Sequence, residues 1–207
     1  MSFNTHYHYH YPLNRNHVKR IQDTLNKSLD EYPRTLVLRV DLRLPDFNTA
    51  SYNADSSLIT RFIASLNAQV DANLLNRQNA GKRVHPCRVR YIWAREFGNC
   101  GKKHYHIALL FNRENYAYPG NYRSVNGEYS HNLAFMVMEA WVRALDLNHS
   151  QYYSLVEFPD NGYYHLSKNS ADFTTQYAEV TTRINYLAKE YSKDYSDGQR
   201  NFGCSQY

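Results

Sequence analysis

The chain has 207 residues, which is enough for one domain with its own hydrophobic core. Hydrophobic residues make up 43 % of it, which excludes a disordered protein, and the 24 Lys and Arg against 19 Asp and Glu give a formal net charge of +5. This mild basicity permits nucleic acid as a partner without requiring it. The 20 Tyr favour a wet surface that holds flat ligands such as bases.

Several classes of protein are excluded by simple patterns. The longest apolar runs, residues 107–111 and 133–138, fall far short of the ~20 residues that a membrane span needs. The N-terminus has no apolar stretch typical of a secretory signal, and three Cys are too few for a disulfide framework. No P-loop motif occurs. We therefore expect a cytoplasmic protein with no membrane contact and no nucleotide cofactor.

The first half of the chain predicts a helix, a strand and a second helix. Residues 1–12 are expected to form a flexible arm. Apolar residues spaced by three and four predict a helix over 16–31, which Pro33 ends. Alternation over 35–44 predicts a strand with one buried face, and a second helix is expected over 56–76, with Asp55 or Ser56 as N-cap.

The second half predicts two hairpins and two more helices. The expected elements are a hairpin of strands 88–97 and 103–111, a helix over 133–145, a hairpin of strands 152–158 and 163–167, and a helix over 171–193. We interpret residues 13–195 as one α+β domain, in which helices pack on an antiparallel sheet of about five strands. Residues 196–207 carry no structural signal and are expected to be a C-terminal tail.

The first hairpin carries the residues that predict chemistry. In a strand, His104 and His106 project to the same face, while Tyr105 points to the opposite, apolar face. A turn at residues 99–101 sets Glu96 opposite His104 and Ala94 opposite His106. A slip of one residue would place Glu96 on the wrong face. Two neutral imidazoles and one carboxylate form a divalent-metal site that can act as a Lewis acid on a phosphate.

The last predicted helix offers a nucleophile. Tyr186 and Lys189 are three residues apart, and so are neighbours on a helix, away from its apolar stripe. Tyr191 lies on the stripe and is expected to pack. A phenol is a weak nucleophile at neutral pH, but a polarised phosphate and a nearby ammonium both help its attack.

The order of these motifs resembles the HUH endonucleases, the rolling-circle replication initiators and relaxases, and above all the single-tyrosine initiators. In that family a strand motif comes first, a carboxylate shortly before the His pair is the third ligand, and Y-x-x-K follows on a helix. The residue between the two His is usually aliphatic there and is Tyr105 here. Nearly the whole chain also resembles the YagK/YfjJ prophage proteins, which are similar to inovirus replication proteins.

This resemblance implies a fold of the HUH, ferredoxin-like type and a role for each motif. Glu96, His104 and His106 would hold Mg²⁺ or Mn²⁺, Tyr186 would attack the scissile phosphate, and Lys189 would orient that phosphate or stabilise its charge. The enzyme would nick one strand, stay on its 5′ end and rejoin it during phage or prophage replication. Its partners would be single-stranded DNA or an origin hairpin and a host helicase. Further DNA contacts are expected from Arg39, Arg43, Lys102, Lys103, Arg183 and Lys193.

Each motif also has a simpler interpretation. An isolated H-x-H is more often a pair of half-buried strand residues, and Glu96, Tyr186 and Lys189 are each common surface or packing residues. The His6–His10 run is a rival H-x-H without a carboxylate partner, and the pair Glu157 and His165 is a weaker alternative. At the level of function, the alternatives are an inactive DNA-binding regulator on the same fold, an HUH transposase and an RNA-processing relative.

Overall fold

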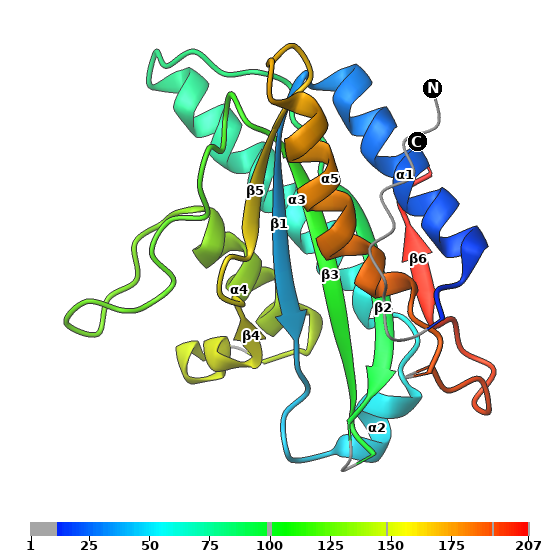
Figure 1. The fold of residues 1–207 in the computed structure, drawn as a ribbon. Coiled ribbons are helices and arrows are strands. Elements are labelled where there is room, and N and C mark those ends of the chain that lie inside the picture. Colours follow the sequence, from blue (N-terminus) through cyan, green and yellow to red (C-terminus); the bar gives the residue numbers. More distant parts are fainter. Residues whose placement is uncertain (1–11, 99–100, 148, 192, 207) are drawn as a thin grey trace.

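The computed structural model describes residues 12–98, 101–147, 149–191 and 193–206, and within them it shows a single open antiparallel sheet with helices on both faces (Figure 1). The strands are β1 (Arg34–Leu42), β2 (Arg90–Phe97), β3 (Lys103–Asn112), β4 (Val156–Glu157), β5 (Tyr163–Ser167) and β6 (Phe202–Cys204). Their order is β4-β1-β3-β2-β6, and β5 also pairs with β1. The predicted α+β class is confirmed, with six strands rather than about five.

The helices form two layers around this sheet. They are α1 (Arg15–Glu31), α2 (Thr49–Ala54), α3 (Leu58–Asn79), α4 (Leu133–Ala144) and α5 (Phe173–Asn185), with short 3₁₀ helices η1 (Ser150–Leu155) and η2 (Tyr186–Ala188). One core lies between the sheet and α1 with α5, and the other lies between the sheet and α3 with α4 (Figure 1). Each sheet face is therefore buried over most of its middle.

Strand β1 differs from the prediction of one buried face. Leu38 and Val40 pack on the α3 and α4 side, while Val37 is fully buried against the α1 and α5 side. The reason is that β1 lies in the interior of the sheet, with β3 along one side and both β4 and β5 along the other. An interior strand covered by helices on both faces is buried on both faces, whatever its alternation suggests.

Three further expectations are corrected. Residues 152–158 form most of η1 and the two-residue β4 rather than a long strand. The last helix ends at Asn185, eight residues before the predicted end at 193. The segment expected to be a tail supplies β6, which pairs antiparallel with β2. The N-terminal run His6–His10 lies outside the described residues.

The predicted start of the second long helix is off by about two residues. Helix α3 begins at Leu58, and the backbone N–H of Ser57 donates to the Asp55 carboxylate at 2.8 Å.

Among the described residues, no helix combines the length and apolar character that crossing a membrane requires.

Candidate functional site

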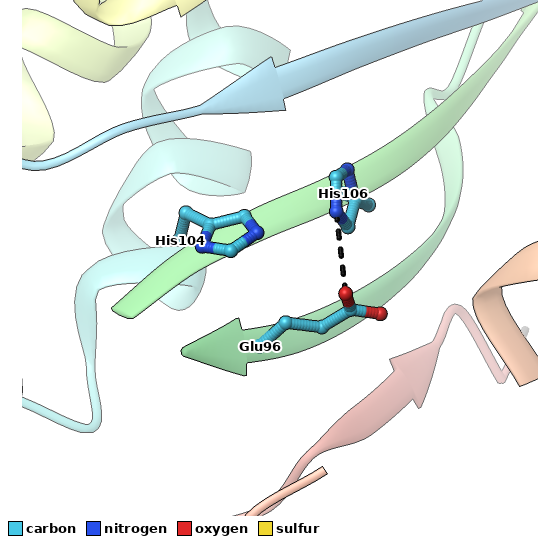
Figure 2. A group of neighbouring side chains, drawn as sticks. All are labelled: Glu96, His104 and His106. Atoms are coloured by element: carbon cyan, nitrogen blue, oxygen red, sulfur yellow. Dashed lines mark ion pairs between the residues drawn. The ribbon is translucent and has the colours of Figure 1, made fainter. Parts of the chain in front are cut away.

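The hairpin of β2 and β3 has the predicted register. Glu96 lies opposite His104, and Ala94 lies opposite His106. One donor atom from each of Glu96, His104 and His106 lies within 4.8 Å of the others, and the three side chains converge on one face of the sheet (Figure 2). Ala94 lies across the ladder from His106, and Ala108 lies two residues along β3 on the same face, so small side chains leave room beside the imidazole. Within the described residues, this trio is the group of His, Cys, Asp and Glu side chains with metal-binding spacing.

A carboxylate on β1, which the sequence analysis did not assign to the site, fixes the orientation of His106. Asp41 lies opposite His106 in the β1–β3 ladder, and the Nδ1–H of His106 donates to its carboxylate at 2.6 Å. The other ring nitrogen, Nε2, then faces Glu96 Oε2 at 3.4 Å. A metal-binding His usually donates the N–H of its other ring nitrogen, the one that does not bind the metal, to a carboxylate.

The gap between His106 Nε2 and Glu96 favours a cation. With Nδ1 protonated, a neutral His106 would present a lone pair to a carboxylate oxygen, and two acceptors repel unless a proton or metal ion lies between them. Burial lowers the pKa of His106, but the hydrogen bonds to Asp41 and Glu96 outweigh it and raise the pKa above 6.5. The residues therefore fit a divalent cation, which would replace the proton.

His104 is prepared differently. Burial and the neighbouring His106 lower its pKa, so the neutral, metal-binding form of His104 is favoured at neutral pH. The two imidazole rings lie 4.9 Å apart and perpendicular to each other. One imidazole is thus kept neutral, while the other is oriented by Asp41.

Two lysines hold Glu96 from the other side. The ammonium of Lys189 lies 2.8 Å from Glu96 Oε2, and that of Lys193 lies 3.0 Å from Glu96 Oε1. The side chains of all three residues are at most 4 % exposed. Burial opposes ionisation of Glu96, but His106, Lys193 and Lys189 together keep its pKa well below the usual range. Because each carboxylate oxygen has two lone pairs, Glu96 can keep these lysines and still ligate a cation.

Tyr186 lies directly beside this group. Its hydroxyl accepts a hydrogen bond from the Lys189 ammonium, which also lies 3.8 Å from the centre of the Tyr186 ring. The ring centroids of Tyr186 and His106 are 5.9 Å apart. Burial lowers the pKa of Lys189, but Glu96 and Tyr186 outweigh it and raise the pKa, so Lys189 stays an ammonium. The structure therefore brings together all five predicted catalytic and metal-binding residues.

The backbone reaches this arrangement by a different route from the one predicted. Tyr186 is the first residue of η2, and a 3₁₀ turn of three residues stacks Tyr186 over Lys189. The chain then becomes extended at Lys189, which forms a β-bridge with Leu13. Tyr191, expected to pack on a continuing helix, is 65 % exposed instead. Ion pairs to Glu96 override the helical spacing of the sequence.

Arg95 anchors the segment that follows Lys193. Its guanidinium is 1 % exposed and donates to the Asp197 carboxylate at 2.8 Å, to the Asn201 side chain at 2.9 Å and to the Asp194 carbonyl at 3.2 Å. These contacts bind residues 194–201 to β2, whose next residue is Glu96. Arg95 therefore helps to place Lys193 at the carboxylate.

The six predicted DNA contacts fall into two groups. Arg43 and Arg183 are exposed, and Arg43 pairs with Glu157; Lys102 is partly exposed and pairs with Asp46. The prediction is wrong for the other three residues as surface contacts. Lys103 is fully buried and donates to the carbonyls of Asn53 and Asp55, Lys193 binds Glu96, and Arg39 is buried beside Asp41.

The weaker alternative pair does not form a site. The carboxylate of Glu157 pairs with Arg43, and His165 Nε2 lies 2.6 Å from the carbonyl of Ala117. Both groups are engaged in separate contacts, and neither joins a metal-binding cluster within the described part of the chain.

Comparison with known proteins assigns the family. The family model described as the YagK/YfjJ C-terminal domain matches residues 2–205. The chain belongs to the YagK/YfjJ family. It is 38 % identical to the uncharacterized protein YagK of Escherichia coli (strain K12), over 92 % of this chain and 94 % of YagK. It is 31 % identical to the uncharacterized protein YfjJ of the same organism, over the full length of both. No solved structure matches.

Membership of the YagK/YfjJ family confirms that part of the resemblance seen in the sequence. The match includes residues 196–205, so the family domain extends through β6, in agreement with the pairing of β6 and β2. The names of the two relatives carry no activity. The function of the site is therefore argued from its own geometry.

Proposed function

We propose that this protein is a metal-dependent endonuclease that nicks and rejoins single-stranded DNA through a covalent link to Tyr186. One observation carries the proposal. The Lys189 ammonium bonds both the Tyr186 hydroxyl and the Glu96 carboxylate, so a nucleophile and a metal-ligand set from separate parts of the chain share one contact. The HUH endonucleases combine the same residue types, and the role that fits such an enzyme here is initiation of phage or prophage DNA replication.

Glu96, His104 and His106 would hold Mg²⁺ or Mn²⁺. A bound divalent ion supplies a Lewis acid that draws negative charge from a phosphate oxygen. The donor set supports this, because its atoms lie within 4.8 Å and Asp41 leaves His106 Nε2 directed at Glu96. Mixed imidazole and carboxylate ligands suit a first-row divalent ion such as Mn²⁺ at least as well as Mg²⁺.

Tyr186 performs the covalent step. Its phenolic oxygen attacks the phosphorus of a phosphodiester, and a new O–P bond forms. The bond from phosphorus to the 3′ oxygen of the preceding nucleotide breaks. The phenolic proton passes to solvent, and the departing oxygen takes up a proton and becomes a 3′-hydroxyl. The 5′ phosphate remains on Tyr186, and attack by a 3′-hydroxyl reverses the step and rejoins the strand.

Lys189 stabilises the reacting oxygen. Its ammonium already donates to the Tyr186 hydroxyl, and its raised pKa keeps it charged at neutral pH. Charge fixed before the reaction, in a site shielded from water, stabilises the negative charge that develops at the oxygen. Glu96 holds Lys189 in this position at 2.8 Å, so the carboxylate serves both as a ligand and as a support.

The test is a covalent adduct assay. The protein is incubated with Mn²⁺ and a mixed pool of labelled single-stranded DNA that includes hairpins, and then denatured. We expect an adduct with the wild type and with Tyr195→Phe, a nearby exposed tyrosine, but none with Tyr186→Phe. Peptide mapping should place the nucleotide on Tyr186.

Other outcomes would redirect the assignment. An adduct that persists in Tyr186→Phe would remove Tyr186 from the reaction. DNA binding without any adduct, unchanged in Tyr186→Phe, would favour a DNA-binding regulator. Preference for terminal hairpins over an origin would indicate a transposase, and sensitivity to 2′-hydroxyl substitution would indicate an RNA substrate.

A further inference from the structure

A groove lies on the opposite side of the sheet from Tyr186. Its lining residues come mainly from α3, from β2 and from the segment around β6. Strands β2 and β6 form one edge of the sheet (Figure 1). The volume of the groove is about 760 Å³, within the range of small-molecule and nucleotide sites. Tyr91 and Trp93, on β2, form its floor, and Ile59 and Ile63 of α3 line one wall. Tyr91 and Trp93 are only partly buried, so neither helix layer covers this edge completely.

The indole of Trp93 presents a flat surface in this groove. Trp93 pairs with Gly203 across the β2–β6 ladder. A Cβ atom added at Gly203 would lie 2.6–2.7 Å from three adjacent indole atoms, so one ring face covers the glycine. The edge contact with Tyr105, at 6.0 Å between centroids, fixes the ring from the core side. Glycine at this position allows the indole to lie along the sheet rather than stand upright on it.

The groove has a strongly positive border. Arg20, Arg88 and Arg200 line it, and it has no Asp or Glu among its lining residues. Among the described residues, no carboxylate forms an ion pair with any of these three arginines. Arg95, which also lines the groove, is by contrast bound to Asp197. Both Arg88 and Arg200 are exposed.

We propose that this groove binds a segment of single-stranded nucleic acid, with a base stacked on Trp93 and phosphates held by Arg88 and Arg200. A flat aromatic floor with an unpaired cationic border is the combination that sequence-tolerant single-strand binding uses. Every base has a face that can stack, and the phosphates supply the anionic partners that the arginines lack. The site goes beyond the proposed cleavage, because it shares no residue with Glu96, His104, His106, Tyr186 or Lys189.

Tryptophan fluorescence gives a local readout of this site. The chain has two tryptophans, and the other one, Trp141, is fully buried. We would titrate the full chain with labelled oligothymidylate, with thymidine monophosphate and with polyglutamate, in the presence of a chelator. We expect the oligonucleotide to quench Trp93. In Trp93→Leu, binding followed by anisotropy should weaken about fivefold or more, the loss typical for one stacked base.

The arginines provide a second variant that leaves the core untouched. Arg88→Gln with Arg200→Gln should weaken binding and reduce the dependence of log K on log salt by about 1.4, since each phosphate contact on a single strand contributes about 0.7. Lys82→Gln with Arg123→Gln is the matched control, because both residues are exposed and neither lines the groove. The control should keep the affinity and the salt slope of the wild type.

Three results would overturn the proposal. The first is an absence of quenching by the oligonucleotide, or an equal loss in both double variants. The second is tight binding of polyglutamate with the same quenching, which would assign the groove to an acidic protein segment. The third is thymidine monophosphate binding as tightly as the oligonucleotide, which would assign it to a free nucleotide. Loss of the Tyr186 adduct alone would affect only the proposed cleavage.

Discussion

Replacing Glu96 by Gln should destabilise the metal-free protein far more than breaking a surface ion pair. The change keeps the shape of the side chain but removes the charge that holds Lys189 and Lys193, at 2.8 and 3.0 Å. Both lysine side chains are at most 4 % exposed, so their charges stay buried without a carboxylate. Removing one partner of a buried pair costs about 3–5 kcal/mol, whereas an exposed pair contributes about 0–1 kcal/mol.

Urea unfolding measures this difference. In the presence of a chelator, and with a slope of about 2–3 kcal/mol per M, the unfolding midpoint of Glu96→Gln should fall by about 1–2 M. Arg43→Gln is the control, because it breaks the exposed pair with Glu157. Its free energy of unfolding should change by less than about 1 kcal/mol.

A double variant tests whether the unpaired charge is the cause. In the Glu96→Gln background, Lys193→Met replaces one uncompensated ammonium by an apolar side chain of similar length in a fully buried position. The double variant should recover about 1–3 kcal/mol relative to the sum of the single changes. If Glu96→Gln costs no more than the Arg43 control, or if the two changes simply add, Glu96 and its lysines do not form a buried network and the reasoning fails.

Three further predictions concern the same residues and the groove. Asp41→Asn should weaken Mn²⁺ binding about 10–100-fold in calorimetry, because it alters the hydrogen bond that orients His106; unchanged affinity would show that Asp41 has no such role. Gly203→Ala places a Cβ atom 2.6 Å from the Trp93 indole and should cost about 1–3 kcal/mol, seen as a lower melting temperature and altered tryptophan emission; an unchanged melt would contradict the close packing. The third concerns pH. Burial opposes ionisation of Glu96, but its cationic partners lower its pKa below 4.5, so its stabilisation is complete above about pH 4.5 and is lost as the pH falls through the lowered pKa. The urea midpoints of wild type and Glu96→Gln should therefore converge in acid, and a constant difference down to pH 2 would refute the linkage.

The hairpin that carries the metal-binding residues was predictable because all its determinants are local. A short turn containing glycine joins two alternating segments, and burial of Tyr105 and Ile107 on the other face excludes a slip of one residue. The observed pairing of Glu96 with His104 follows from these two facts alone. Sequence reasoning is strongest where turn and alternation agree.

The contribution of Asp41 was not predictable from the same kind of pattern. Alternation over 35–44 puts Asp41 on the face opposite Leu38 and Val40, but it gives no neighbour and no register. The β1–β3 ladder joins segments separated by α2, α3 and β2, and only the folded sheet sets Asp41 opposite His106. A carboxylate on a strand that precedes an H-x-H strand is at most a reason to test that register.

The prediction for the segment after α5 was wrong for a related reason. Apolar spacing predicted a helix to residue 193, because Leu187 and Ala188 continue the apolar stripe. Both side chains are indeed buried in the structure. The spacing of apolar residues carries no information on the ion pairs that Lys189 and Lys193 form with the buried carboxylate of Glu96 on β2. The three residues of β6 are likewise too few for alternation to be recognised, and the strand forms because β2 has an open edge.

Strand β2 separates the two sites that this structure presents. Successive residues of a strand point to opposite faces, so Trp93 faces the groove while Ala94 and Glu96 face the metal-binding group. No side chain belongs to both sites. Adduct formation and base stacking can therefore be lost independently, through Tyr186 on one face and through Arg88 and Arg200 on the other. A surface substitution that removed both would indicate damage to the sheet between them rather than a role in either site.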